Sequence, residues 1–391
     1  MISVFDKKDE CCGCTACKNI CPTKAIDMIP DEEGFLYPEI NQELCIDCGL
    51  CRSLCAFQNE YNTYSNLGTP KVYAAKHKDK NVRMNSSSGG AFTAISDYVL
   101  GNKGIVFGVA FDENMNAVHR RANTSEERDK FKGSKYVQSD LKSTYKEIKQ
   151  LLEEDIQVLF TGTPCQTAGL NKFLGGHNTK KLILCDIVCH GTPSPLMWRD
   201  HIEYLEKKEK SKVANYYCRH KVKGWHTHTE MVIYNNGKKD YKSTISQKHK
   251  TLFYSHNILR PSCHNCKYTN LIRPSDVTIA DFWGIEKYMP DFDDNKGVSL
   301  VLVNTEKGEQ IFKDITKSLI IRESNIKDCM QRPLKEPSKP SQSRVEFWED
   351  YKTHGYDYII EKYAGYNLKS IIKQNIKLVL IKLGLFKYLR Q

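Results

Sequence analysis

Two runs of closely spaced cysteines near the N-terminus constrain this chain more than any other feature of its sequence. The first run lies in ECCGCTACKNICP, and both runs follow the same spacing, C-x2-C-x2-C-x3-C, so the segment is an internal repeat. Thiols at this density serve as disulfide partners, as zinc ligands or as ligands of iron-sulfur clusters. The cysteines of the two runs are Cys11, Cys14, Cys17 and Cys21, followed by Cys45, Cys48, Cys51 and Cys55.

Length and composition argue against disulfides. The chain has 391 residues, enough for two or three domains with a large core, so it does not need cross-links to fold. The first residues, MISVFDKKDE, lack the apolar run of a signal peptide, and no stretch reaches the roughly 18 apolar residues of a membrane span. We therefore expect a cytoplasmic protein. Thiols stay reduced in that compartment, so the 16 cysteines favour metal or redox chemistry.

The spacing distinguishes the two metal alternatives. In the bacterial ferredoxin run, the first three cysteines bind one 4Fe-4S cluster and the fourth, which precedes a proline, binds the other. Zinc sites usually combine two close pairs across a long spacer, whereas three crowded cysteines suit one face of a cubane cluster. Pro22 follows the first run, Ala56 replaces the corresponding proline in the second, and Cys12 has no expected ligand role. We predict a first cluster on Cys11, Cys14, Cys17 and Cys55 and a second on Cys45, Cys48, Cys51 and Cys21.

The cysteine repeat is predicted to form a separate module, residues 1–60, of the α+β ferredoxin-like class. Between the runs, AIDMIPDEEGFLYPEIN alternates apolar and polar residues around an acidic turn, which predicts a short hairpin. The module carries 11 acidic and 5 basic residues, whereas the rest of the chain carries 36 and 53. This asymmetry fits a module that docks on the body or on a donor protein, and it fits a merely solvated surface equally well.

From residue 71 onward, short apolar segments alternate with helical ones. The segments KVYAAK, GIVFGVAF, IQVLFTGTP, KLILCDIVCHG and GVSLVLVN are typical of buried strands, and the stretches between them include GGAFTAISDYVLGN and CQTAGLNKFL. This alternation predicts an α/β body with a mixed, largely parallel sheet, which we divide into residues 71–150 and 151–330. Ligands of such sheets bind beyond the carboxyl ends of the strands.

Two polar loops of the body are candidates for cofactor binding. NSSSGGAFTAI leads directly into an apolar helix, where free backbone amides would face a small anion such as a flavin pyrophosphate. Serine-rich segments also simply cap helices, so both alternatives stay open on composition alone. The second loop, FKGSKYVQSD, presents Lys135, Tyr136 and Gln138, which would contact a ring system or only decorate a loop.

Four further cysteines lie in loops at the ends of the body's predicted strands. Cys165 follows one strand, Cys189 ends the next, and Cys263 and Cys266 form a later C-x2-C loop. We predict that these four hold a third 4Fe-4S cluster, with Cys185 as a reserve ligand. A zinc site, or thiols that only pack in the core, are the alternatives. The cysteines without a close partner, which we expect only to pack, are Cys218 and Cys329.

A basic and aromatic stretch, CRHKVKGWHTHTE, supplies candidates for substrate binding. Arg219 and Lys221 carry positive charge suited to an anionic substrate, and Trp225 and His226 follow them. His190, next to a predicted cluster ligand, is suited to relay a proton or to donate a hydrogen bond to sulfur. Solvated loops and satisfied side chains explain these residues equally well. A later motif, ADFWG, offers a flavin-pocket lining or a simple turn cap through Asp281, Trp283 and Gly284.

Taken in order, the double cysteine run, SSSGGAFTAI, SKYVQSD, FTGTPCQ, CHGTPSP, CHNC and ADFWG resemble the coenzyme F(420) hydrogenase/dehydrogenase beta-subunit family over about residues 5–330. The resemblance implies an FAD-containing iron-sulfur protein that passes electrons between clusters and a two-electron carrier or substrate through the flavin. It also implies that the flavin lies in the 71–150 part of the body. The implied flavin-site residues are Ser86, Ser87, Ser88, Gly89 and Gly90, with Lys135, Tyr136 and Gln138 nearby.

Two functional classes follow. In the first, the chain is an oxidoreductase in its own right, fed by a ferredoxin or a deazaflavin-type donor and acting on a small-molecule substrate. Family members also occur in bacterial surface-polysaccharide gene sets, so the family name does not define that substrate. In the second, the chain is an electron-transfer subunit of a larger redox complex and has no substrate site of its own. A zinc-binding scaffold is a third alternative. The candidates for catalytic residues are His190, Arg219 and Lys221.

Beyond residue 330 the family pattern ends. Residues 331–391 are predicted to form an exposed linker and a basic amphipathic helical tail, whose final stretch from residue 366 has six basic residues and no acidic one. Such a helix suits peripheral contact with the inner face of a membrane, an acidic partner, or docking back on the body. The net charge of +11 does not by itself indicate nucleic-acid binding, because no recognisable reader module accompanies it.

Overall fold

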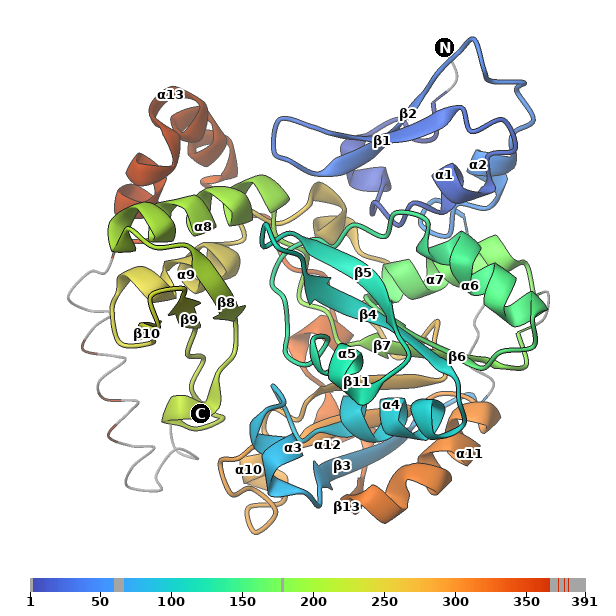
Figure 1. Ribbon diagram of the computed structural model, residues 1–391, viewed down its shortest axis with the longest axis vertical. Helices are drawn as coiled ribbons and strands as arrows, with labels where there is room; N and C mark the ends of the chain where they lie inside the picture. The colour runs from blue at the N-terminus through green and yellow to red at the C-terminus, as the bar shows by residue number, and fades with distance from the viewer. Residues whose placement is uncertain are drawn as a thin grey trace.

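The fold was analysed in a computed structural model of the chain, which describes residues 3–59, 67–176, 179–365, 372, 376 and 379. An N-terminal module lies at one end of the molecule, beside an α/β body built on an eight-stranded sheet (Figure 1). A small three-stranded sheet and a group of helices flank the body. The α+β module and the α/β body therefore have the predicted fold classes.

The N-terminal module consists of two cysteine loops joined by a hairpin. Strands β1 (Ile26–Pro30) and β2 (Leu36–Ile40) pair antiparallel, which confirms the predicted hairpin. The acidic turn between them is closed by Asp31, whose carboxylate accepts hydrogen bonds from the amides of Glu33 and Phe35. Each cysteine loop runs into a short helix, α1 (Ala16–Ile20) in the first repeat and α2 (Leu50–Ser53) in the second.

The large sheet is parallel in its middle and antiparallel at both edges. Its strands are β3 (Lys71–His77), β4 (Ile105–Phe111), β5 (Ala117–Ala122), β6 (Val158–Gly162), β7 (Leu182–Ile187), β11 (Val277–Asp281), β12 (Ser299–Val303) and β13 (Leu319–Ser324). Their order is β13-β3-β12-β11-β7-β6-β4-β5, and the parallel strands are β11, β7, β6 and β4. The carboxyl ends of these four strands therefore lie at one edge of the sheet.

Helices cover both faces of this sheet. On one face, α4 (Ala91–Gly101) and α11 (Glu306–Ile315) pack on residues such as Leu159. On the other face, α6 (Thr144–Glu153) and α7 (Pro164–Leu174) pack on Val158 and Phe160. Successive residues of a strand point to opposite faces, so β6 contributes to both cores. A strand buried on both sides is apolar throughout, which is why the sequence identified these strands.

The N-terminal module shares a hydrophobic core with the body. Cys12, Cys14 and Phe57 belong to the same buried cluster as Tyr145 of α6 and Ala168 of α7. Helix α1 packs against both α6 and α7, and Figure 1 shows the module lying next to these two helices. The cysteine loops are therefore seated on the body rather than tethered beside it.

The remaining elements form a second unit beside the sheet. Strands β8 (Val213–Tyr217), β9 (Met231–Tyr234) and β10 (Lys239–Asp240) pair antiparallel. The helices around them are α8 (Pro195–Glu209), α9 (Lys248–Ser255) and α13 (Arg344–Tyr363). Short helices elsewhere are α3 (Lys80–Met84), α5 (Ser125–Asp129), α10 (Ile285–Tyr288) and α12 (Ile326–Cys329).

The segment predicted to be an exposed linker has many exposed residues, but two of its residues anchor it to the body. Leu334 and Ser338 are buried. The Ser338 hydroxyl donates to the carbonyl of His190 at 2.5 Å, and the Ser338 carbonyl oxygen lies 2.7 Å from His264 Nδ1. Prolines and serines marked the absence of regular structure here, which is not the same as exposure.

The predicted basic tail lies almost entirely outside the described residues. Three of its apolar positions are described, and each side chain is about half exposed: Ile372, Ile376 and Val379. Among the described residues, no helix is both long enough and apolar enough to cross a membrane.

Candidate redox site

The two cysteine loops share one backbone conformation. Gly13 and its counterpart in the second repeat, Asp47, both have left-handed backbone angles, with φ of 70° and 52°. Thr15 and its counterpart Gly49 do the same, with φ of 61° and 70°. Alternating left-handed residues turn successive backbone amides toward one centre, which suits an anionic group. The sequence repeat is therefore a structural repeat.

The first set of predicted ligands is gathered from both repeats. Burial raises the pKa of the Cys17 thiol well above its usual value, and the neighbouring thiols of Cys14, Cys11 and Cys55 raise it further. Cys55 thus lies with the first three cysteines of the other run, as the crossed ferredoxin pattern predicts. Four clustered thiols in a buried place suit a metal centre, because metal binding keeps thiolates charged where burial would protonate them.

The second set surrounds a cavity of about 360 Å³ at the surface of the module. Its lining includes Cys21, Cys45, Cys48 and Cys51 together with apolar residues such as Ile26 and Ile40. Cys48 is exposed, whereas in the first set Cys14 is buried and the other three cysteines are partly buried. The donor set fits a 4Fe-4S cluster, and of the two N-terminal sites this one faces solvent.

The third set is assembled at the carboxyl ends of the parallel strands. Thr163 caps α7 after β6 and holds the Cys165 sulfur 3.1 Å from its hydroxyl oxygen. The segment that follows β7 places Cys189 beside it. Burial raises the pKa of the Cys189 thiol, and Cys263, Cys165 and Cys266 add to the shift, so the four thiols are neighbours. The structure brings together the four cysteines that the sequence selected.

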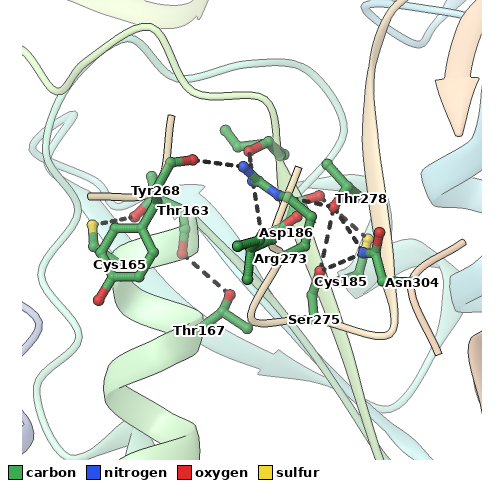
Figure 2. Close-up of polar contacts among 12 residues, drawn as sticks. Thr163, Cys165, Thr167, Cys185, Asp186, Tyr268, Arg273, Ser275, Thr278 and Asn304 are labelled. Carbon is green, nitrogen blue, oxygen red and sulfur yellow. Dashed lines mark hydrogen bonds and ion pairs between the residues drawn. The ribbon is translucent and has the colours of Figure 1, made fainter. Parts of the chain in front are cut away.

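The structure does not bring the reserve ligand Cys185 to this set. Figure 2 shows Cys165 and Cys185 on opposite sides of an ion pair between Arg273 and Asp186, whose Nη2 and Oδ2 atoms are 2.9 Å apart. Cys185 belongs to the core under α4 and α11. Its place within β7 explains the difference, because a strand residue pointing into the core cannot also reach the loop at the strand end. Cys218 and Cys329 are buried in separate cores, as expected.

The first and third sets are adjacent, which the sequence did not indicate. The Cys12 thiol is a close neighbour of both Cys14 and Cys165, and its interaction with Cys165 lowers the pKa of that thiol to about 7. Gly169 of α7 permits the approach, since a Cβ there would lie 2.8 Å from the Cys14 sulfur. Cys12 therefore lies between the two sets instead of standing beside one. Gly169, in CQTAGL, was the one feature of the sequence that could have indicated the contact between the first set and α7.

The loop 86–90 precedes α4 as predicted, and it is fixed by contacts with neighbouring segments. The Ser87 hydroxyl accepts from the Ser134 amide at 3.0 Å, which joins this loop to the loop 131–140. The Gly89 amide donates to the Ser299 hydroxyl at 2.9 Å, and a Cβ on Gly89 would collide with the carbonyl of Ala75. Part of this serine and glycine pattern thus serves close packing against β3 and β12.

The members of the loop 131–140 lie in different places. Lys135 Nζ donates to the carbonyls of Lys130 and Lys132, and burial lowers its pKa to about 7. Tyr136 stacks on Phe253 with ring centroids 4.7 Å apart. Gln138 lies at the cysteine junction, where its Nε2 donates to the carbonyl of Cys12 at 3.3 Å. The three side chains therefore have different partners, and Tyr136 also lies near Arg219.

The basic stretch forms a buried cluster with ADFWG. Arg219 pairs with Asp281 at 2.7 Å and lies 4.7 Å from the centroid of Trp283. Trp225 stacks on Trp283 and donates to the other oxygen of Asp281 at 2.6 Å. Gly284 begins α10 with a φ of 93°. These residues lie at the end of β11, on the same edge of the sheet as the third cysteine set.

Two other candidates have different surroundings. Lys221 Nζ donates to the carbonyls of Arg83, Ser88 and Lys296 at 2.6, 2.5 and 2.8 Å, so it clamps the loop 86–90 from within. His190 Nε2 lies 2.9 Å from His256 Nε2, and burial lowers its pKa to about 4.

His226 is separate from these. It pairs with Asp293 at 2.6 Å, and Glu286 lies in the same buried group.

Together, the cysteine loops and the sheet define an iron-sulfur redox protein in which a cysteine-rich module is seated on an α/β body. Residues 155–328 match the C terminus of the coenzyme F(420) hydrogenase/dehydrogenase beta subunit, and residues 72–146 match its N-terminal part. Residues 10–59 match a 4Fe-4S dicluster domain. The chain belongs to the coenzyme F(420) hydrogenase/dehydrogenase beta-subunit family, which confirms the resemblance and relates the chain to oxidoreductases.

Individual relatives resemble this chain over smaller parts. An uncharacterized polyferredoxin-like protein of Methanocaldococcus jannaschii is 40% identical over 63 residues, 14% of this chain and 38% of its own length. An uncharacterized ferredoxin of the same organism is 39% identical over 46 residues, 12% of this chain and 25% of its own. The chain thus spans well under half of either protein. A chain of the F(420)-reducing NiFe hydrogenase complex from Methanosarcina barkeri aligns with a TM-score of 0.46 and 18% identity, covering 78% of this chain and 97% of that one.

Proposed function

We propose that this chain is an iron-sulfur flavoprotein oxidoreductase that passes electrons between 4Fe-4S clusters and a two-electron carrier or organic substrate through FAD. The observation that carries the proposal is the adjacency of the first and third cysteine sets, joined by the Cys12 thiol. Clusters in neighbouring sites exchange electrons one at a time. Bound FAD supplies the conversion between one-electron and two-electron transfer.

The protein's own contribution is to hold three clusters in a line from surface to body. The second set is at the surface, the first set is buried beneath the module, and the third set lies at the sheet edge. The proposed ligands are, in that order, Cys45, Cys48, Cys51 and Cys21; Cys11, Cys14, Cys17 and Cys55; and Cys165, Cys189, Cys263 and Cys266.

Contacts between the predicted flavin-site loops support a flavin site beyond the third set. The Ser134 amide joins the loop 131–140 to Ser87, and Lys221 joins the 219–226 stretch to Ser88. Arg219 and Trp283 supply a cation and an indole ring at the same edge of the sheet. A flavin offers a flat ring for stacking and a pyrophosphate for a cation, so this chemistry fits. Arg219 is proposed to bind the flavin and Lys221 to orient the loop 86–90, and neutral His190 is proposed to relay a proton through its ring nitrogens.

Electrons are proposed to reach the chain at the second set. Leu44, Ile46 and Leu50 are exposed apolar residues of the loop that carries Cys48. Such side chains favour transient docking of another protein. We propose a ferredoxin or a deazaflavin-type carrier as the donor and a small molecule as the acceptor. We propose a bacterial surface-polysaccharide pathway as one source of small molecules to test as electron acceptors.

The second candidate is an electron-transfer subunit that has no substrate site of its own. The observation that favours it is the family itself, which is described as the beta subunit of a hydrogenase or dehydrogenase. Under this alternative, gentle purification from the native source retains a large partner subunit. The first proposal expects the isolated chain to turn over a substrate with a reduced donor.

Anaerobic purification followed by metal and flavin analysis tests the core of the proposal. Three clusters predict about 12 iron and about 12 sulfide per chain, together with one FAD. Iron and sulfide without flavin would favour the subunit alternative. Abundant zinc in a colourless protein, with neither iron nor sulfide, would refute both and favour the zinc scaffold.

A further inference from the structure

One arginine from the body is buried against the first cysteine set. Arg260 is 1% exposed and precedes the short 3-10 helix Pro261–Asn265, which carries Cys263 of the third set. Its Nε donates to the carbonyl of Cys11 at 2.7 Å, and its Nη2 lies 3.6 Å from the Cys11 sulfur. The body therefore places a fixed positive charge directly beside a proposed cluster ligand of the module.

The surroundings of Arg260 hold it in place without neutralising it. Nη1 donates to the amide oxygen of Gln138 at 2.9 Å, and Nη2 donates to the carbonyl of Leu36 at 3.0 Å. The guanidinium lies over the rings of Tyr37 and Phe35, at 4.1 and 5.4 Å from their centroids. These contacts are with neutral groups.

Other buried arginines of this protein are paired differently. Arg219 pairs with Asp281, Arg273 with Asp186 and Arg128 with Asp97. Among the ion pairs of the described residues, none is formed by Arg260. Burying a charge without a counter-charge is costly, so buried charges are normally paired or neutralised by a bound ion. The groups near Arg260 that become anionic when metal is bound are proposed ligands, Cys11 of the first set, whose sulfur lies 3.6 Å from Nη2, and Cys263 of the third.

We propose that Arg260 is the counter-charge of the cluster held by the first set and that it raises the reduction potential of this cluster above that of the second. This inference rests on the proposed clusters. Reduction adds one electron to a cluster that is already anionic with its four thiolates, and a fixed cation nearby favours the more negative state. The resulting order of potentials draws electrons from the exposed second cluster into the buried first one.

The test is an EPR-monitored redox titration of the full-length, anaerobically prepared protein. Arg260→Gln removes the charge but keeps a planar amide. We expect the equilibrium constant for reduction of the first cluster to fall about tenfold, which is about 59 mV for one electron. The third cluster should shift less, and the second should not shift. The first cluster's spectrum is identified as the one lost in Cys14→Ser.

Two variants separate charge from packing. Arg260→Lys keeps the charge and loses the planar fork, so the first cluster should retain most of its potential. Arg128→Gln removes an arginine of similar burial that pairs with Asp97 on α4, and all potentials should stay in place.

The proposal is overturned if Arg260→Gln leaves the first cluster unshifted or shifts all three clusters equally. If Arg260→Gln loses iron, the test is made with Arg260→Lys. A reduction potential of the first cluster in Arg260→Lys as low as that of the second cluster would refute a role for the charge. Wild-type protein without iron or sulfide would instead refute the proposed function.

Discussion

Cys185 and Cys189 come from one strand and the segment that follows it, yet they occupy different environments. The Cys185 thiol is in the core under α4, where burial raises its pKa, whereas Cys189 faces Cys263, Cys165 and Cys266. One residue is surrounded by apolar side chains and the other by thiols. Position relative to the end of β7 thus decides which of them is a proposed ligand.

This difference makes a paired prediction. Cys189→Ser should cost about 4 iron and 4 sulfide per chain, because serine does not replace thiolate in a 4Fe-4S cluster. Cys185→Ser should retain full iron and sulfide, although a buried hydroxyl will lower stability by about 1–3 kcal/mol. Iron and sulfide analysis of the two purified variants checks this. Equal iron loss in both variants would indicate that Cys185 is also a cluster ligand.

A buried histidine predicts how stability depends on pH. His119 is buried, its Nε2 lies 3.2 Å from the carbonyl of Thr161, and its Nδ1 lies 3.1 Å from the Ser139 hydroxyl. Burial lowers the pKa of His119 to about 4, against about 6.5 in an unfolded chain. The stabilisation by neutral His119 is therefore complete above about pH 6.5 and is lost as the pH falls toward 4.

Between pH 7 and pH 5, the wild type should lose about 2 kcal/mol more unfolding free energy than His119→Gln, whose side chain does not titrate. Anaerobic denaturant titrations at the two pH values measure how the unfolding free energy of each protein changes with pH. Acid loss of clusters affects the two proteins alike, so it cancels in the comparison. If the unfolding free energies of the two proteins changed equally between pH 7 and pH 5, His119 would not be held neutral in the folded protein.

At the level of single residues, the spacing between the cysteines was the feature of the sequence that predicted the site. The offsets of Cys11, Cys14 and Cys17 predicted which thiols meet, because short local spacing determines geometry. The contact of Cys12 with Cys165 was not predictable in this way. It depends on where α1 settles on α7, which is a tertiary contact between segments far apart in the chain.

The β1–β2 hairpin is a second attachment of the cysteine module to the body, in addition to the shared core. The Ser194 hydroxyl at the start of α8 donates to the carbonyl of Glu33, and Arg344 of α13 pairs with the Glu33 carboxylate. Burial raises the pKa of Glu33 to about 7. At the tip, Gly34 has a φ of 82°, and a Cβ there would lie 2.5 Å from the Cβ of Leu196. The tip fits because it lacks a side chain.

Gly34→Ala should therefore weaken the attachment of the module. Its matched control is Gly237→Ala, which has a φ of 83° and no atom within 4 Å of the added Cβ. Both alanines incur the left-handed backbone cost of about 1–2 kcal/mol, but only Gly34→Ala adds a clash of about 1–3 kcal/mol. Thermal unfolding and hydrogen exchange in β1 and β2 should show the larger loss for Gly34→Ala. Equal losses of stability in the two variants would mean that α8 shifts enough to accommodate the added Cβ.

Most strands in the middle of the sheet were predictable, with the exception of β11, and the edge strands were not. The apolar runs of β4, β6 and β7 predicted strands because such strands must be apolar throughout. The edge strands β5 and β13, with sequences AVHRRA and LIIRES, escaped prediction because they alternate with charged residues. Edge strands commonly carry charge that discourages pairing with other chains. The apolar pattern therefore identified most of the central strands but missed β11, a short strand that contains threonine and aspartate, and it missed both edge strands.

The whole molecule places the two sequence-defined parts in one continuous core. Cys14 of the module and Ala168 of the body belong to the same buried cluster. No composition argument predicts such a contact, because the acidic module and basic body would also fit as separate units. The arrangement implies that an electron entering at the module reaches the body without a change of domain orientation.

Cys14→Ser tests this continuity. It should remove about 4 iron and 4 sulfide per chain and leave the proposed FAD bound, because Cys14 lies on the module and the proposed flavin loops lie on the body. Reduction of the flavin by an external one-electron donor should then slow by at least about 100-fold relative to wild type, since the middle of the path is missing. Stopped-flow absorbance under anaerobic conditions measures the rate. Photoreduction of the bound flavin in the same sample serves as the control, and an unchanged donor-driven rate would contradict a path through the first set.

The packed segment around Ser338 also bears on how the protein withstands dioxygen. Its hydroxyl contacts the residue next to Cys189, and its carbonyl contacts the histidine between Cys263 and Cys266. Polypeptide from outside the sheet thus forms one wall over the third set. A chain truncated before Ser338 is expected to expose the proposed third metal site to dioxygen, in addition to the second, which already faces solvent.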